Sequence, residues 1–115
     1  MKIAIVGSRE IDHVDLSEFV TDGDEIVSGG AIGVDRCAAE YAREHGLKLT
    51  EFLPQYQLYG RGAPIRRNRQ IVEYADKVIA FWDGCSRGTL STIQFAQKAG
   101  KPYEVVTVRT KNSPF

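Results

Sequence analysis

Short apolar runs alternate along the chain with longer segments whose apolar residues have helical spacing. Three runs are continuously apolar and end at glycine or a polar residue, which is typical of strands covered on both faces: KIAIVG, EIVSGG and KVIAFWDG. The run LKLTEFLP alternates between apolar and polar residues and predicts an edge strand, and YEVVTV predicts a last strand. The sequence therefore predicts five strands.

The segments between these runs predict helices. A short helix is expected after the first strand, and the helix after the second strand ends at Gly46. Two more helices are expected to start near Pro64 and Ser86, and the last ends at Gly100. One face of the second helix is apolar at positions spaced i, i+3, i+4, i+7 and i+8: Val34, Cys37, Ala38, Tyr41 and Ala42.

This alternation predicts an α/β fold: a single Rossmann-like, three-layer domain over residues 1–115, with residues 108–115 as a loose tail. Right-handed crossovers favour an open parallel sheet of about five strands in the order 3-2-1-4-5, with helices on both faces. In such sheets ligands bind beyond the strand carboxyl ends where the strand order reverses, here between the first and fourth strands.

The overall charge narrows the expected partners. The chain has 115 residues, with fifteen basic and fifteen acidic side chains, so it has no global attraction to nucleic acid or to an anionic membrane. No apolar run approaches the ~20 residues of a spanning helix. We therefore expect a cytoplasmic protein, with nucleic acid an unlikely partner and no membrane partner. Cys37 and Cys85 match no zinc spacing, and neither a metal nor a cofactor is expected.

The stretch SGGAIGVD after the second strand has two interpretations. It matches neither the dinucleotide fingerprint nor the P-loop. Its glycines could let the backbone approach a phosphate at a helix N-terminus, or they could simply form a tight turn. Asp35 could complement the helix dipole, or it could accept a hydrogen bond from a sugar hydroxyl.

The third helix contains a polar residue on its apolar arc. Asn68 lies at the centre of the arc, and Arg67 and Arg69 flank it. An inward amide must be hydrogen-bonded or it costs roughly 1–3 kcal/mol. Asn68 could tie the helix to the preceding loop. We favour a functional role, in which its amide bridges the loop after the first strand and a ligand, and in which it matters more than either arginine.

Two other loops contain residues suited to binding. DGCSRGTLST follows the fourth strand, and its Ser86 and Thr89 could cap a helix or hold phosphate oxygens. LPQYQLYGRGAP is long for a strand-to-helix connection and predicts a lid, in which Tyr56 and Tyr59 could stack on a base and Arg61 could reach an anion.

Three loops with phosphate-binding potential converge on one predicted crevice. We expect it to bind a nucleotide or a nucleotide-derived small molecule, which favours a phosphate cradle over a plain turn. Asp35, Asp83, Arg67 and Arg69 are the candidates for catalysis. The predicted ligand-binding residues are Gly7, Ser8, Arg9, Ser28, Gly29, Gly30, Gly33, Asp35, Arg67, Asn68, Arg69, Trp82, Asp83, Gly84, Ser86, Gly88 and Thr89.

Five segments together resemble the SLOG superfamily, named from the Smf/DprA and LOG proteins, and within it the small single-domain YspA-type branch. They are IAIVGSRE, IVSGGAIGVD, YGRGAPIRRNRQIVEYAD, VIAFWDGCSRGT and AGKP. The resemblance implies a Rossmann-like domain that binds a nucleotide-derived ligand, with phosphate contacts at Gly29, Gly30, Gly33, Gly88 and Thr89. Our first hypothesis is therefore a binding module that acts as a sensor.

The same resemblance implies two alternatives. LOG enzymes hydrolyse the N-glycosidic bond of nucleoside 5′-monophosphates and use a PGGxGTxxE motif, but here Thr92 takes the place of its glutamate. DprA suggests single-stranded DNA binding, which the four arginines at positions 61, 66, 67 and 69 favour and the neutral total disfavours. SLOG domains also pair through helices, and Phe95, expected on an exposed helix face, predicts a homodimer.

Overall fold

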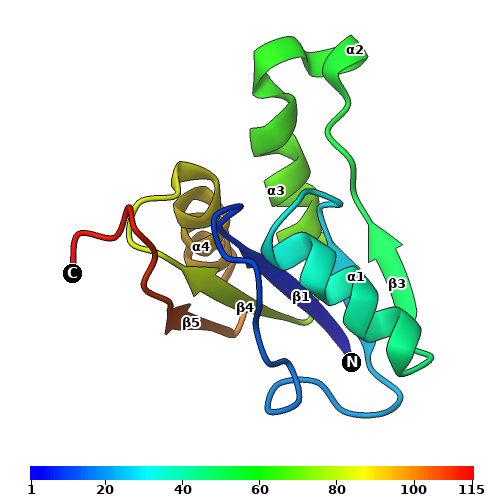
Figure 1. Ribbon diagram of the computed structural model, residues 1–115. Coiled ribbons are helices and arrows are strands. Elements are labelled where there is room, and N and C mark those ends of the chain that lie inside the picture. Colours follow the sequence, from blue (N-terminus) through cyan, green and yellow to red (C-terminus); the bar gives the residue numbers. More distant parts are fainter.

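The computed structural model describes residues 1–115 and contains five parallel strands and four α-helices (Figure 1). The strands are β1 (Lys2–Gly7), β2 (Glu25–Ser28), β3 (Lys48–Glu51), β4 (Lys77–Trp82) and β5 (Tyr103–Thr107). The helices are α1 (Val34–Glu44), α2 (Tyr56–Tyr59), α3 (Ala63–Tyr74) and α4 (Arg87–Ala99), with a 3-10 turn, η1 (Gly60–Gly62), between α2 and α3.

The sheet order β3-β2-β1-β4-β5 confirms the predicted fold class and topology. β1 lies at the centre and pairs in parallel with β2 on one side and β4 on the other. The middle residues of β1 and β4 are buried on both faces, as their continuous apolar runs predicted. β3 is an edge strand, as its alternating pattern predicted.

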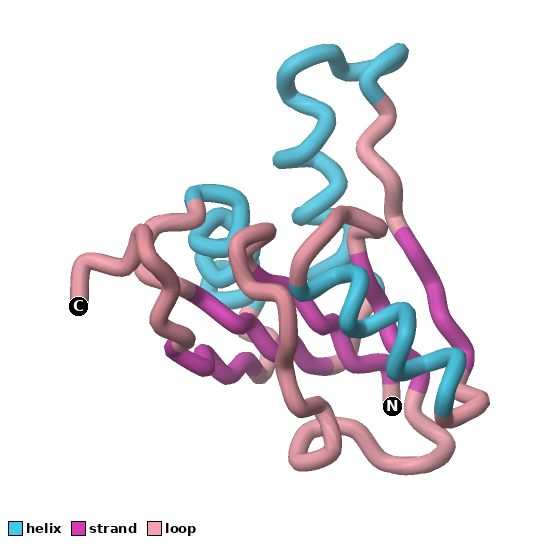
Figure 2. The backbone as a smooth tube through the Cα atoms, in the orientation of Figure 1, coloured by secondary structure: helices cyan, strands magenta, loops and turns pink.

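Figure 2 shows helices on both faces of the sheet, and two apolar cores lie between them and the strands. On one face α1 packs Val34, Ala38 and Ala42 against β1 and β2. On the other face α3 and α4 supply a second set of buried residues: Ile71, Val72, Ala75, Ile93 and Ala96. The result is the predicted three-layer sandwich, whose strand carboxyl ends face one common edge.

The connection between β1 and β2 differs from the prediction. It contains turns and extended backbone in place of a short helix. Ile11, Leu16 and Val20 are buried and fill the core beside α1. Only Leu16 and Val20 have the i, i+4 spacing of a helix face, and a loop with three apolar anchors covers this part of the sheet instead.

The long connection before α3 is partly helical. α2 and η1 form its middle, and neither contains a buried residue. In Figure 1 this segment and the start of α3 rise beyond the carboxyl edge of the sheet, on the side to which the β3 arrow points. We call residues 53–66 the arm.

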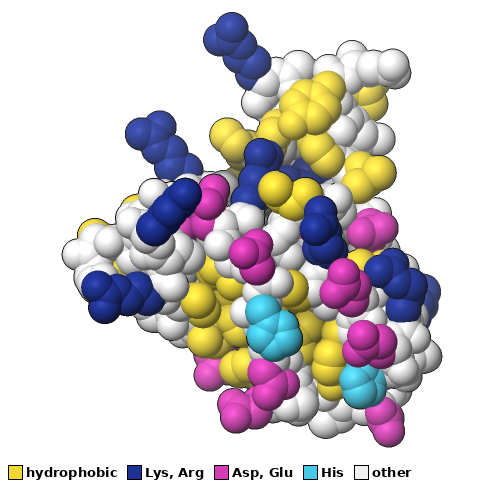
Figure 3. Space-filling view, viewed as in Figure 1, with side chains coloured by type: hydrophobic (Ala, Val, Ile, Leu, Met, Phe, Trp, Pro, Cys, Tyr) yellow, Lys and Arg dark blue, Asp and Glu magenta, His cyan; other side chains and the backbone are white.

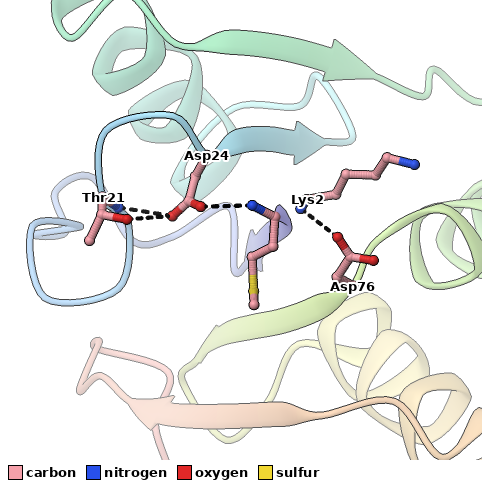
Figure 4. Close-up of polar contacts among 5 residues, drawn as sticks. Lys2, Thr21, Asp24 and Asp76 are labelled. Atoms are coloured by element: carbon pink, nitrogen blue, oxygen red, sulfur yellow. Dashed lines mark hydrogen bonds and ion pairs between the residues drawn. The ribbon is translucent and has the colours of Figure 1, made fainter.

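Hydrogen bonds fix the amino end of β1, at the edge opposite the strand carboxyl ends (Figure 4). Asp24 accepts bonds from the N-terminal amine at 3.0 Å and from the Thr21 amide at 2.9 Å. Asp76 accepts a 2.7 Å bond from the Lys2 amide. These two carboxylates therefore hold the central strand in place.

The structure differs from two of the predictions about the protein surface. Phe95 is half-buried and packs against the core that α3 and α4 share with the sheet, so it is less exposed than expected; the homodimer stays a prediction. The segment after β5, expected to be loose, folds back on the β4–α4 connection, where Pro114 and Phe115 pack against Gly84. No helix is both long and apolar enough to cross a membrane.

Candidate functional site

A polar crevice of about 410 Å³ opens beyond the carboxyl ends of β1 and β4, where the strand order reverses. Four of its nineteen lining residues are hydrophobic, so most of the lining can hydrogen-bond. The walls come from the loops after β1, β2 and β4, from the first turns of α3 and α4, and from Asn112 of the C-terminal segment. Its place agrees with the general rule for ligand sites in open α/β sheets.

Asp83 organises the loop after β4. Its carboxylate accepts bonds from the amides of Cys85 and Ser86, both at 2.9 Å, and from Ser8 Oγ at 3.0 Å. Thr110 Oγ1 adds a longer contact at 3.5 Å. Burial raises the pKa of Asp83, but these hydrogen bonds outweigh it and lower the pKa below its usual value. Asp83 is thus an ionised structural anchor for three segments.

The N-terminus of α4 faces the crevice. Ser86 is the N-cap, and its Oγ accepts a 3.3 Å bond from the Thr89 amide. The predicted capping by Ser86 is therefore present. The amides of Arg87 and Gly88 have no hydrogen-bond partner in the protein, and Gly88 lines the crevice. Free amides at a helix N-terminus form a favourable position for an anion.

Two amides of the glycine loop after β2 are hydrogen-bonded within the loop. Asp35 Oδ2 accepts a 3.1 Å bond from the Ala31 amide, and Ser28 Oγ accepts a 3.4 Å bond from the Gly30 amide. Gly33 has φ +76°, and a β-carbon there would lie 2.6 Å from the Ser8 carbonyl oxygen. Gly33 is therefore needed for close packing of two loops, whatever binds beside them.

Arg67 projects from α3 to the glycine loop. Its Nη1 donates to the Gly29 carbonyl at 2.6 Å, and its Nε donates to Asn68 Oδ1 at 3.0 Å. Burial lowers the pKa of Arg67, while the nearby Asp35 and Tyr56 act in the opposite direction. The two N–H groups of Nη2 have no protein partner and remain able to bind an anion.

Asp35 differs from Asp83 in its electrostatics. Burial raises the pKa of Asp35 above its usual value, although the bond from Ala31 and the charge of Arg67 oppose the rise. Asp35 and Arg67 make no direct ion pair, but both side chains lie against the α-carbon of Gly29. The carboxyl of Asp35 is thus buried in the crevice, and the neighbouring groups only partly offset the cost of burying its charge.

Asn68 is buried, as the helical arc predicted, and it links two helices. Its Nδ2 donates to the Gly88 carbonyl in the first turn of α4 at 3.3 Å, while its Oδ1 accepts from Arg67. The expected bond to the loop after β1 is not present. Asn68 therefore positions the free end of α4 and the Arg67 guanidinium together.

The structure brings most of the predicted residues together. Those that line the crevice are Gly7, Ser8, Arg9, Gly29, Asp35, Arg67, Asn68, Asp83, Ser86, Gly88 and Thr89. Six others lie outside its lining: Ser28, Gly30, Gly33, Arg69, Trp82 and Gly84. Arg69 instead pairs with Glu73 at 2.9 Å on the exposed side of α3, because a one-turn spacing brings the two charges together.

Sequence reasoning missed some of the lining. Val6, Glu10, Ala31, Pro64, Ile71, Cys85, Thr92 and Asn112 also face the crevice. Most adjoin predicted residues, so extending each motif by a few positions would have found them. Asn112 had no signal in the sequence, because only the folding back of the C-terminal segment brings it there.

No protein-family model matches the chain. Over 83 residues it is 37% identical to the Gene 61 protein of Mycobacterium phage D29, and the aligned part covers 67% of this chain and 66% of the phage protein. The structure is similar to that of DNA processing protein A from Helicobacter pylori, with a TM-score of 0.73 and 26% identity, covering 98% of this chain and 68% of that one. That structure concerns a single-stranded DNA binding mode.

This similarity corrects one prediction. Nucleic acid was expected to be an unlikely partner, and the likeness to a protein that binds single-stranded DNA contradicts it. The expectation failed because it rested on total charge. Between Glu51 and Glu73 the chain has four arginines and no acidic residue, so a neutral total conceals a local basic segment.

The similarity also agrees with the motifs found along the chain. The strand order and the crevice of this protein match the expectation from those motifs. So does its Rossmann-like fold, which resembles that of DNA processing protein A. The similarity to DNA processing protein A therefore supports the assignment of the chain to the SLOG superfamily.

Proposed function

We propose that the protein binds a nucleotide in the crevice, with a phosphate at the N-terminus of α4. The free amides of Arg87 and Gly88, at the edge of a crevice of about 410 Å³, are the observation that carries this proposal. Two unpaired amides and a helix dipole stabilise an anion at this position. We also propose, from the resemblance of its sequence motifs, that the protein is a member of the YspA-type branch.

The charges around the crevice support an anionic ligand. Arg9 and Arg67 line it, and the Nη2 group of Arg67 has no protein partner. Asp83 is negative, but four donors surround it, so little of its hydrogen-bonding capacity faces the ligand. The polar lining suits a phosphorylated sugar better than an apolar molecule.

Single-stranded DNA is the second candidate ligand. The similarity to DNA processing protein A favours it, because that protein binds single-stranded DNA. The basic segment between Glu51 and Glu73 also favours it, since it borders the crevice through Pro64 and Arg67. A strand could then place one of its nucleotides in the crevice.

LOG-like hydrolysis has less support. Thr92 occupies the position of the motif glutamate, and its Oγ1 donates to the Gly88 carbonyl at 3.1 Å. Of the candidate catalytic residues, Asp83 is already hydrogen-bonded on both oxygens, and Arg69 points away. Asp35 is the one crevice carboxyl with a raised pKa, as a proton-transferring group requires. Release of free adenine from AMP, lost in Asp35→Asn, would favour this activity.

Calorimetric titration of nucleoside monophosphates tests the proposal. Asn68→Ala should lower affinity roughly five- to hundredfold, because it leaves the Gly88 carbonyl and Arg67 without their shared partner. Gln94→Ala is the matched control, since this exposed amide lies on α4 outside the crevice. If wild type binds no nucleotide, or if both variants bind like wild type, the proposed site is wrong.

A further inference from the structure

The arm lies beside the crevice and is exposed to solvent. α3 links the two, because its Pro64 and Arg67 line the crevice while Ile65 and Arg66 belong to the arm. In Figure 1 the arm rises beyond the strand carboxyl ends, so a chain-like ligand leaving the crevice meets it next. The arm is thus placed for a ligand longer than one nucleotide.

The arm exposes a large share of the protein's accessible apolar surface. Five of the ten large hydrophobic residues that are exposed lie on it: Leu53, Tyr56, Leu58, Tyr59 and Ile65. Figure 3 shows hydrophobic side chains gathered over this upper part of the molecule, with Lys and Arg side chains beside them. Ala63 is the one buried residue of the arm, and exposed apolar groups gathered on such a segment indicate a binding surface.

The charge of the arm identifies the kind of partner. Arg61 and Arg66 are exposed and make no ion pair, and no acidic residue lies between Glu51 and Glu73. The Arg66 guanidinium lies 4.4 Å from the centre of the Tyr59 ring, so base-stacking and phosphate-binding groups adjoin. A polyanion complements this charge, whereas a second copy of the same arm would repel it.

Tyr56 connects the arm to the crevice. It begins α2, which packs against α3, the helix that carries Arg67, and its side chain is largely exposed. Leu53 packs near Gly30, at the rim of the same glycine loop. A base that follows the crevice nucleotide could therefore stack on Tyr56. Aromatic rings between arginines suit unpaired bases, since bases in a duplex are already stacked.

We propose that the arm binds the nucleotides flanking the one in the crevice, so that single-stranded DNA is the preferred ligand. Tyr56 and Tyr59 stack on bases, and Arg61 and Arg66 bind phosphates. This inference rests on the proposed function, since it takes the crevice nucleotide as the starting point of the strand.

Fluorescence anisotropy with oligothymidylates, from the mononucleotide to about ten nucleotides, tests it. Affinity should rise with length in wild type. Tyr56→Ala and Tyr59→Ala should each weaken the longer oligonucleotides roughly five- to hundredfold and leave thymidine monophosphate within about twofold. Tyr56→Phe should keep the wild-type affinity, because the ring remains. Arg61→Gln and Arg66→Gln should each reduce the salt slope by ~0.7.

Tyr103→Ala and Arg43→Gln are the matched controls, because both residues are exposed on elements away from the crevice. Equal affinity for the mononucleotide and the long oligonucleotide would overturn the arm proposal while leaving the crevice site standing. Loss of mononucleotide binding in Tyr56→Ala would also overturn it. If the arm variants changed the mass in light scattering but not DNA affinity, the arm would be a self-association surface.

Discussion

The β2–α1 and β4–α4 loops occupy similar places but use their amides differently. Each leads from a strand carboxyl end into a helix, and each has a buried carboxylate nearby, Asp35 or Asp83. In the glycine-rich β2–α1 loop, Ser28 and Asp35 bind the amides of Gly30 and Ala31. In the β4–α4 loop, the first two amides of the helix stay free.

The difference shows that glycine density alone does not locate an anion site. The amides of the glycine loop that are paired with Ser28 and Asp35 cannot bind a phosphate without breaking those bonds. Free amides are found only after every donor has been matched with its acceptor. The amides of Asp35 and Arg36 at the start of α1 are also free, but they adjoin the Asp35 carboxylate, which disfavours an anion. We therefore propose the β4–α4 loop, where Gly88 lines the crevice, as the phosphate site.

The largest expected effect is on stability, at Asp83. Asp83→Ala leaves two part-buried amides and the buried Ser8 hydroxyl without their acceptor, so the free energy of unfolding should fall by roughly 3 kcal/mol. Urea unfolding measures the change, and Glu18→Gln, at an exposed acid, is the control. A loss below about 1 kcal/mol would mean that water or neighbouring groups replace the carboxylate.

A smaller effect is expected at Asp35, with the opposite dependence on pH. Its folded-state pKa is raised, so its favourable contribution is complete below the ordinary value of 3.8 and is lost as pH rises through the folded pKa. Asp35→Asn should therefore gain stability relative to wild type as pH rises. For Asp83, whose pKa is lowered, wild-type stability is lost as pH falls through the folded pKa. The free energy of unfolding of Asp35→Asn and Asp83→Asn is measured from acidic to neutral pH and compared with wild type. The difference from wild type should change with pH in opposite directions for the two variants. A change in the same direction would contradict the comparison.

The smallest effect is expected at Arg69, the neighbour of the arginine that binds the glycine loop. Its exposed pair with Glu73 is worth only a few tenths of a kcal/mol, about 0.3–0.5, and lies away from the crevice. Arg69→Ala should keep nucleotide affinity within about twofold, whereas Arg67→Ala should lose about tenfold or more. Similar losses in both variants, measured by calorimetry, would show that the crevice extends farther along α3 than the structure indicates.

The sequence predicted the strands, their order and the location of the crevice, because these depend on local apolar patterns and on general rules of topology. It did not predict the loop between β1 and β2, where Ile11, Leu16 and Val20 cover the sheet without a helix. Leu16 and Val20 alone are spaced as on a helix face, and only the packing beside α1 shows that all three residues anchor a loop.

Within the site, the sequence predicted which side chains gather but not what each one binds. Asn68 was placed correctly on the inward face of α3, but its partner, the Gly88 carbonyl, belongs to a distant helix. Asn112 reaches the crevice through folding of the C-terminal segment. Such partners depend on tertiary contacts that periodicity and motif spacing do not encode.

The most direct test of the phosphate site is to remove one free amide of α4. Arg87 is the first residue of the helix, where proline fits well, and Ser86 before it has an extended conformation at φ −61° and ψ 116° that proline tolerates. Both Arg87→Pro and Arg87→Ala remove the guanidinium charge. Arg87→Pro also deletes the backbone N–H, whereas Arg87→Ala keeps it.

AMP titration of these two variants, with helix content followed by circular dichroism, gives the decisive comparison. Arg87→Ala should bind AMP within about threefold of wild type, since its side chain is exposed and outside the crevice lining. Arg87→Pro should bind about tenfold or more weakly at unchanged helix content, because one charge-assisted hydrogen bond is lost. Equal affinities in the two variants would contradict a phosphate at the N-terminus of α4.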